Sequence, residues 1–189
     1  MKNLAIFASG KGSNADNICN YFTDHQSIHI NLIVSDRKHA GVFDVAKKYD
    51  VESLYINKDG WQQPEHLLNE LQKRKIGFIV LAGFLKLIPA ALIHAYDKKI
   101  INIHPALLPK HGGKGMFGMY VHEAVYHAKE KETGISIHFV DEHYDEGDII
   151  FQAKTNIDPE DSTTAIAKKI HQLEMKYFPK VIEDVILKF

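Results

Sequence analysis

The sequence predicts an α/β fold with a mostly parallel sheet, helices on both faces and an antiparallel edge near the C-terminus. Strand-like and helix-like segments alternate between residues 4 and 81, which is the rhythm of a parallel sheet. Residues 78–81 are all apolar, as expected of a central parallel strand that is covered on both faces. Two later strand-like segments flank an acidic turn and indicate an antiparallel pair.

Composition favours one soluble, cytoplasmic domain that acts on small molecules. The length of 189 residues suits a single domain. The formal charge of −1 gives no electrostatic reason to expect nucleic acid or an anionic membrane as a partner. Cys19 is the only cysteine, so we expect no internal disulfide and no multi-cysteine zinc site, which fits a reducing compartment. No apolar run approaches the length of a membrane span.

Each element follows from a local pattern. The expected strands lie at residues 4–8, 28–35, 53–56, 78–81, 100–104, 134–140 and 149–153, and the expected helices at 15–22, 43–49, 64–73, 121–128 and 162–187. Pro64 opens its helix at a position that proline favours. The strand at 134–140 alternates apolar and polar residues and is therefore expected to be half covered. Pro179 is expected to interrupt the last helix.

A glycine turn follows the first strand and precedes the first helix. Gly10 and Gly12 allow backbone amides to approach a ligand, and the helix N-terminus adds unpaired donors, so the expected ligand is an anion. Gly10, Gly12 and Ala15, followed by Asp36, also match the dinucleotide-binding fingerprint. A phosphate site is the preferred interpretation, followed by a tight turn without a ligand and then by a dinucleotide site.

The strand at 100–104 carries two polar side chains in an isoleucine-rich run. Asn102 and His104 point to one face, about 6.5 Å apart at about 3.3 Å of rise per residue. Pro105 ends the strand and restricts the backbone that aims the imidazole. Taken alone, this pair fits a catalytic site and a structural strand end equally well.

Three further segments leave alternatives open. Residues 82–89 fit a pocket for a flat ring or, preferably, the core, and the glycine-rich residues 111–118 fit a lid over the site or a plain connector. Residues 141–148 contain five carboxylates, most of which we expect to be solvated. One of them, if it reached His104, would keep that histidine protonated.

Together these motifs resemble those of the phosphoribosylglycinamide (glycinamide ribonucleotide) formyltransferases, a family of folate-dependent enzymes. Four segments carry the resemblance: Gly10-Lys11-Gly12-Ser13-Asn14, Leu81-Ala82-Gly83-Phe84, Asn102-Ile103-His104-Pro105 running to Lys110, and Gly134-Ile135-Ser136-Ile137-His138-Phe139-Val140 running to Gly147. Their order and spacing cover nearly the whole chain, which makes the resemblance specific.

The resemblance implies a Rossmann-like twisted sheet in one formyltransferase domain over residues 1–189. Residues 1–100 would form the phosphate-binding half, and residues 101–189 the catalytic and folate-binding half. Such enzymes transfer the formyl group of 10-formyltetrahydrofolate to the amine of 5-phosphoribosylglycinamide in de novo purine (IMP) biosynthesis, giving formylglycinamide ribonucleotide and tetrahydrofolate. The folate is a co-substrate, and neither a metal nor a nicotinamide is required. Both partners would be small molecules, and the protein a monomer or a weak homodimer.

The resemblance also assigns site residues. Asn102, His104 and Asp145 match the catalytic trio, and Glu174 matches the acid that contacts the substrate amine. The expected phosphate-binding residues are Gly12, Ser13 and Asn14. The expected folate-binding residues are Leu85, Lys86, Leu87, Ile88, Asn102, Asp141, Glu142, His143, Tyr144 and Asp145.

Some positions depart from the family pattern. Ala106 replaces a frequent serine and Lys86 a familiar arginine, neither of which changes the chemistry. No arginine lies between Lys58 and Gln63, where some members contact the folate. The loop at 111–118 is longer than in the common form of the family.

In the expected mechanism, Asn102 and protonated His104 donate to the oxyanion that forms at the formyl carbon. His104 also acts as general acid, with Asp145 keeping it protonated. Other formyl-handling enzymes, a nicotinamide-dependent oxidoreductase and a non-catalytic ligand-binding protein are the alternatives.

Overall fold

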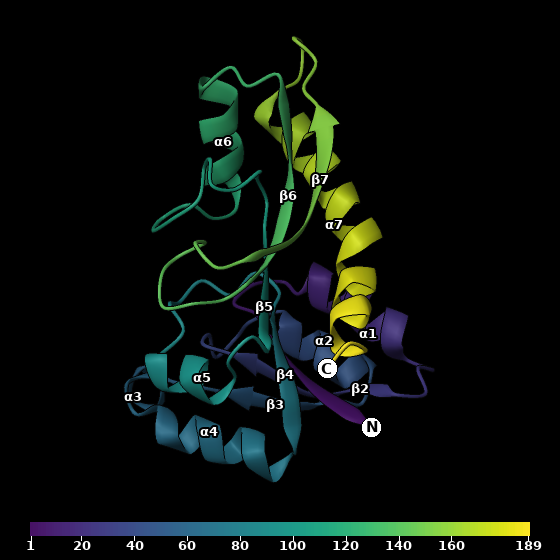
Figure 1. The fold of residues 1–189 in the computed structure, drawn as a ribbon, viewed down its shortest axis with the longest axis vertical. Helices are drawn as coiled ribbons and strands as arrows, with labels where there is room; N and C mark the ends of the chain where they lie inside the picture. Colours follow the sequence, from purple (N-terminus) through teal and green to yellow (C-terminus); the bar gives the residue numbers. More distant parts are fainter.

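The computed structural model describes all 189 residues and contains one seven-stranded sheet in the order β3-β2-β1-β4-β5-β6-β7 (Figure 1). The strands are β1 (Lys2–Phe7), β2 (Ile28–Ser35), β3 (Glu52–Tyr55), β4 (Ile76–Leu81), β5 (Ile100–His104), β6 (Glu132–Phe139) and β7 (Ile149–Asn156). Strands β1 to β5 pair in parallel, whereas β6 is antiparallel to both β5 and β7. The predicted fold class is therefore confirmed.

Seven helices accompany the sheet. They are α1 (Ser13–Phe22), α2 (Val42–Lys48), α3 (Lys58–Gln62), α4 (Pro64–Lys73), α5 (Ala90–Ala95), α6 (Met119–His127) and α7 (Thr163–Ile186). Helices α1, α2 and α7 lie together along one side of the sheet, and α4 and α5 lie on the other (Figure 1). Strands β6 and β7 extend beyond the parallel part of the sheet and carry α6 at their far end.

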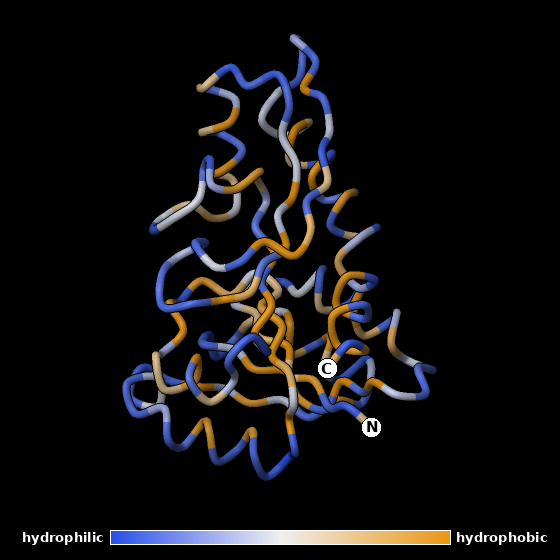
Figure 2. Tube along the Cα trace, viewed as in Figure 1, coloured by the Kyte–Doolittle hydropathy of each residue, from blue (hydrophilic) through white to orange (hydrophobic).

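Two hydrophobic clusters occupy the two faces of the sheet, and the apolar colouring of Figure 2 is concentrated there. Side chains alternate along each strand, so Leu4 and Ile6 of β1 join the cluster under α1 and α7, while Ala5 and Phe7 join the cluster under α4. Cys19 is buried in the first cluster, and burial raises the pKa of its thiol to about 12.

Helix α7 continues through Pro179, so the predicted interruption is wrong. A proline inside a helix leaves the carbonyl four residues earlier without its usual donor. Here that carbonyl belongs to Met175, and it accepts a hydrogen bond of 2.9 Å from the side-chain amide of Asn17 on α1. A side chain from another helix thus satisfies the carbonyl that the proline leaves free.

Strand β6 is buried on both faces rather than half covered, which corrects the expectation from its alternating pattern. Two of its buried polar residues, Ser136 and His138, have hydrogen-bond partners. The Ser136 hydroxyl donates to the carbonyl of Ala106 at 2.7 Å and accepts from the backbone amide of Leu108 at 2.9 Å. The alternation therefore reflects specific polar partners and not exposure to solvent.

Two short helices, α3 and α5, were not predicted. The side chain of Asn57 caps α3 by accepting from the backbone amide of Gly60 at 2.8 Å, and α5 begins directly after Pro89. Both are too short to show a clear apolar period. None of the helices in the structure combines the length and apolar character needed to cross a bilayer.

Candidate active site

A cavity of about 580 Å³ lies at the carboxyl ends of β4 and β5, close to the N-terminus of α1. The chain runs from β1 outward to β3 and then returns to β4 on the other side of β1, so the sheet changes direction beside this cavity. Ligands of open α/β sheets bind at such a switch point. The volume is in the range of small-molecule sites.

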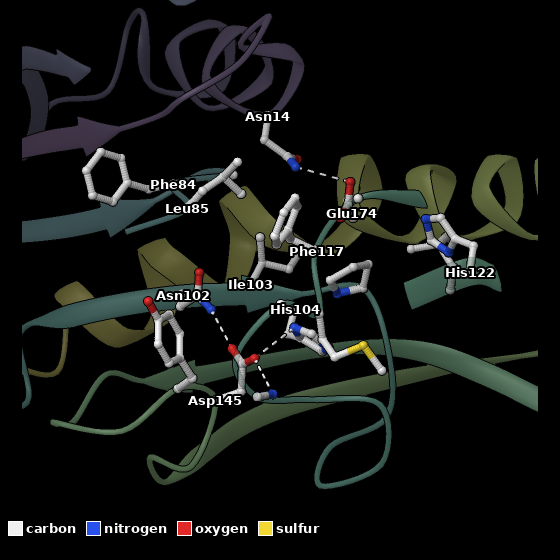
Figure 3. A pocket seen from close by; sticks show the side chains of 18 of the residues that line it. Asn14, Phe84, Leu85, Asn102, Ile103, His104, Phe117, His122, Asp145 and Glu174 are labelled. Atoms are coloured by element: carbon white, nitrogen blue, oxygen red, sulfur yellow. Dashed lines mark hydrogen bonds and ion pairs between the residues drawn. The ribbon is translucent and has the colours of Figure 1, made fainter. Parts of the chain in front are cut away.

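The structure brings Asn102, His104 and Asp145 together in the cavity wall (Figure 3). His104 ends β5 with 3 % of its surface exposed, and its Nδ1 lies 3.4 Å from Asp145 Oδ2. Its Nε2 lies 2.8 Å from the backbone carbonyl oxygen of His111. Asp145 follows β6 and has a φ of 60°, a left-handed conformation that Asp tolerates better than most residues. Its Oδ2 also accepts from the backbone amide of Gly113 at 3.0 Å.

The protonation of this pair differs from the expectation. Burial, helped by the neighbouring His138 and His111, lowers the pKa of His104 below its ordinary value, although the attraction of Asp145 and the hydrogen bond to the His111 carbonyl oppose this. Burial raises the pKa of Asp145, but contacts with His138, His104 and the amide of Gly113 outweigh it and leave that pKa below its ordinary value. At neutral pH, an ionised Asp145 therefore faces a His104 that is mainly neutral. The prediction that Asp145 keeps most of His104 protonated is wrong for the protein without substrates.

The Asn102 amide is also oriented differently from the expectation. Its Nδ2 lies 3.0 Å from His138 Nε2 and 3.4 Å from Asp145 Oδ1. Its oxygen points away from Asp145 (Figure 3). The amide nitrogen thus already contacts two protein atoms, and donation from Asn102 to an oxyanion would compete with these contacts.

Asn14 and Glu174 form the opposite wall of the cavity (Figure 3). Asn14 Nδ2 donates to Glu174 Oε2 at 3.1 Å, whereas Asn14 Oδ1 is buried without a partner. Burial raises the pKa of Glu174, although contacts with Asn14 and His171 oppose that rise. This wall thus offers one unpaired acceptor and a carboxyl group whose pKa lies above its ordinary value.

Of the three expected phosphate-binding residues, only Asn14 lines the cavity. Gly12 and Ser13 immediately precede it, at the start of α1. Gly12 has a φ of 88°, and a Cβ atom there would lie 2.9 Å from Val42 Cγ2. Glycine is therefore required at this turn by backbone conformation and by the close approach of α2.

Only part of the expected folate-binding set reaches the cavity. Its members in the cavity wall are Leu85, Asn102, Tyr144 and Asp145. The members outside it are Lys86, Leu87, Ile88, Asp141, Glu142 and His143. Ile88 is buried in the core, and Leu87 is exposed. Residues 82–89 are therefore divided, because Leu85 lines the cavity whereas Ile88 belongs to the core.

Sequence reasoning missed several residues that line the cavity. The glycine-rich loop supplies one side of it, including Met116 and Phe117. His122 of α6 also lines it and is 7 % exposed, with a buried Nδ1 that has no partner. The sequence left open whether this loop lies over the site or is a plain connector, and the structure places residues 113–118 against the cavity.

The acidic residue of the dinucleotide fingerprint already has a partner. Asp36 Oδ1 accepts from the hydroxyl of Ser9 at 2.6 Å, and only 8 % of its side chain is exposed. This internal hydrogen bond competes with the role of binding a ribose hydroxyl. The structure contains no cluster of three or more His, Cys, Asp or Glu side chains that could hold a metal ion.

The fold and this site define a protein of the α/β class with a small-molecule cavity built around an amide, an imidazole and a carboxylate. The family model of formyl transferases matches residues 2–182. The chain therefore belongs to the formyl transferase family.

Curated relatives support this assignment. The chain is 36 % identical to phosphoribosylglycinamide formyltransferase of Bacillus subtilis, over 98 % of this chain and 95 % of the relative. It is 38 % identical to the chloroplastic phosphoribosylglycinamide formyltransferase of Arabidopsis thaliana, over 96 % of this chain. The chain spans only 64 % of that relative's length and 60 % of the length of the relative from Vigna unguiculata.

Solved structures show the same fold. Phosphoribosylglycinamide formyltransferase from Bacillus halodurans superposes with a TM-score of 0.88 at 32 % identity, covering 98 % of this chain and 95 % of that one. Glycinamide ribonucleotide transformylase 1 from Geobacillus kaustophilus gives a TM-score of 0.88 at 35 % identity, covering 96 % of this chain and 97 % of that one.

Proposed function

We propose that the protein transfers the formyl group of 10-formyltetrahydrofolate to the amine of 5-phosphoribosylglycinamide, in de novo purine biosynthesis. The observation that supports this most strongly is the convergence of Asn102, His104 and Asp145 on a cavity at the switch point of the sheet. Relatives that are named for this activity match nearly the whole chain. Both substrates are small molecules.

In the proposed mechanism, the catalytic residues are Asn102, His104 and Asp145. A neutral His104, as its lowered pKa implies, is able to accept a proton from the attacking amine at Nε2 once substrate binding displaces the His111 carbonyl from that nitrogen and the ring hydrogen lies on Nδ1, facing Asp145. The cation that results is stabilised by Asp145 at Nδ1, and Nε2 then donates a proton to the folate nitrogen as that nitrogen leaves. His104 thus acts first as base and then as acid.

The remaining roles follow the two walls of the cavity. Gly12, Ser13 and Asn14 bind the ribonucleotide phosphate at the start of α1, and Glu174 contacts the substrate amine. Leu85 and Tyr144 contact the folate. Holding two reactants together supplies much of the acceleration, since effective molarities reach about 10⁵–10⁸ M. A cytoplasmic location and a monomer or weak homodimer stay predictions from the sequence.

The test is a turnover assay with the purified chain and both substrates. We expect release of tetrahydrofolate that depends on the ribonucleotide. Release without the ribonucleotide would indicate hydrolysis instead of transfer. No release, under conditions where a known formyltransferase is active, would refute the proposal. Titration with a dinucleotide, followed by the fluorescence of Trp61, tests the oxidoreductase alternative.

A further inference from the structure

We propose that His138 is a positioning residue that determines which edge of the Asn102 amide faces the cavity. As a consequence, the carbonyl oxygen of Asn102 accepts a hydrogen bond from the attacking amine. This inference rests on the formyl transfer proposed above, in which His138 has no assigned role.

The environment of His138 defines its tautomer. Its Nδ1 lies 2.8 Å from the backbone carbonyl oxygen of Phe139, which only accepts hydrogen bonds, so Nδ1 carries a hydrogen. The side chain is 2 % exposed and is held on β6 beside β5, where His138 is the register partner of Asn102. Nε2 lies 3.0 Å from Asn102 Nδ2 and 3.6 Å from Asp145 Oδ1; in the neutral ring it is an acceptor, and of these two groups only the Asn102 amide donates to it.

The tautomer of His138 in turn orients Asn102. The amide nitrogen lies 3.0 Å from His138 Nε2 and 3.4 Å from Asp145 Oδ1, so both acceptors receive a hydrogen. Reversing the amide would place its oxygen against a ring lone pair and a carboxylate oxygen, which would be repulsive. The oxygen therefore lies on the opposite side, away from Asp145 (Figure 3).

This orientation suits the nucleophile. As the amine nitrogen forms its bond to the formyl carbon, it gains positive charge, and its remaining hydrogens become stronger donors. A fixed carbonyl oxygen beside one of them binds the transition state more tightly than the ground state. One proton then leaves the amine nitrogen, and the folate nitrogen gains one as its bond to the formyl carbon breaks. Asn102 thereby aligns the attacking amine.

Nitrogen NMR on the whole ¹⁵N-labelled protein tests the tautomer without any substrate. Long-range proton–nitrogen correlations at neutral pH are expected to show His138 with a hydrogen on Nδ1 and none on Nε2. The spectrum of His138→Gln assigns the signal. A hydrogen on Nε2, alone or together with one on Nδ1, would overturn the proposal.

Two substitutions test the consequence for turnover. His138→Gln keeps an acceptor near the position of Nε2, whereas His138→Phe keeps a ring without one. We expect kcat of the glutamine variant to stay within about threefold of the unaltered protein, and that of the phenylalanine variant to fall about 10- to 100-fold with an unchanged KM for the ribonucleotide. His29→Phe is the matched control, because His29 lies on β2 at the amino end of the parallel strands.

The kinetic outcomes separate the possibilities. Equal losses in both His138 variants, or no loss in His138→Phe, would refute the positioning role. If the unaltered protein showed no formyl transfer, the proposed function would fail, while the NMR result would still decide the tautomer.

Discussion

Replacing Asp145 by Asn is the most informative single change, because it removes the charge beside His104 and changes little else in volume. The Nδ1–Oδ2 distance is 3.4 Å, with side chains that are 4 % and 11 % exposed. At an effective dielectric constant of about 20, the attraction between an imidazolium and the carboxylate is about 5 kcal/mol. This attraction exists only when His104 is protonated, which in the proposed mechanism occurs after the amine attacks.

The expected loss in rate follows from how much of this attraction acts in the transition state. If one third of the attraction acts in the transition state, its loss lowers kcat about 15-fold, and if all of the attraction acts there, its loss lowers kcat about 4,000-fold. We expect a value between these limits, with an affinity for the ribonucleotide that is unchanged within about threefold because Asn14 and Glu174 lie on the opposite wall. Steady-state turnover and calorimetric binding give the two quantities.

Asp148→Asn is the matched control for Asp145→Asn. Asp148 lies in the same acidic turn, but it is exposed and its only ion pair is to Lys98 at 3.7 Å. This control is expected to retain the kcat of the unaltered protein. An unchanged kcat in Asp145→Asn, or an equal loss of kcat and ribonucleotide affinity, would refute the assigned role of Asp145.

Three further predictions concern stability and the opposite wall. Gly12→Ala is expected to lower the free energy of unfolding by about 1–3 kcal/mol, because φ is 88° and the added Cβ atom would lie 2.9 Å from Val42 Cγ2. Urea unfolding measures this, and an unchanged urea midpoint would show that the turn accommodates the Cβ atom without loss of stability. Asn17→Ala leaves the carbonyl of Met175 without its donor and should cost about 1–3 kcal/mol, measured in the same way, and equal stability would show that water replaces the amide. The folded-state pKa of Glu174 is raised, so the stabilising effect of its protonation is lost as the pH rises. Glu174→Gln should therefore have a higher free energy of unfolding than the unaltered protein at pH 7 to 8, and this difference should shrink below pH about 4.5. A difference in free energy of unfolding that does not change with pH would contradict the raised pKa of Glu174.

The features that the sequence predicted well are those that depend on neighbours along the chain. The glycine turn before α1, the apolar strand β4 and the end of β5 at Pro105 all follow from local sterics and burial. The mostly parallel sheet and its antiparallel edge followed from the order of these elements, whereas the strand order came from the structure. The same patterns placed Asn102 and His104 on one face of one strand.

The features that could not be predicted depend on contacts between distant residues. Helix α7 passes through Pro179 because Asn17, far earlier in the chain, satisfies the free carbonyl. The orientation of Asn102 is determined by His138 across the β5–β6 pair. The pKa of His104 depends on its burial and on its distance from Asp145, and both are properties of the folded chain.

A crystal structure with 5-phosphoribosylglycinamide and a non-transferable folate analogue is the most direct test of the account. We predict that the substrate amine and the formyl-bearing nitrogen meet in the cavity within hydrogen-bond distance of Asn102 and His104, with the phosphate at the start of α1. Ligands bound elsewhere on the chain, or an amine far from both side chains, would contradict the account.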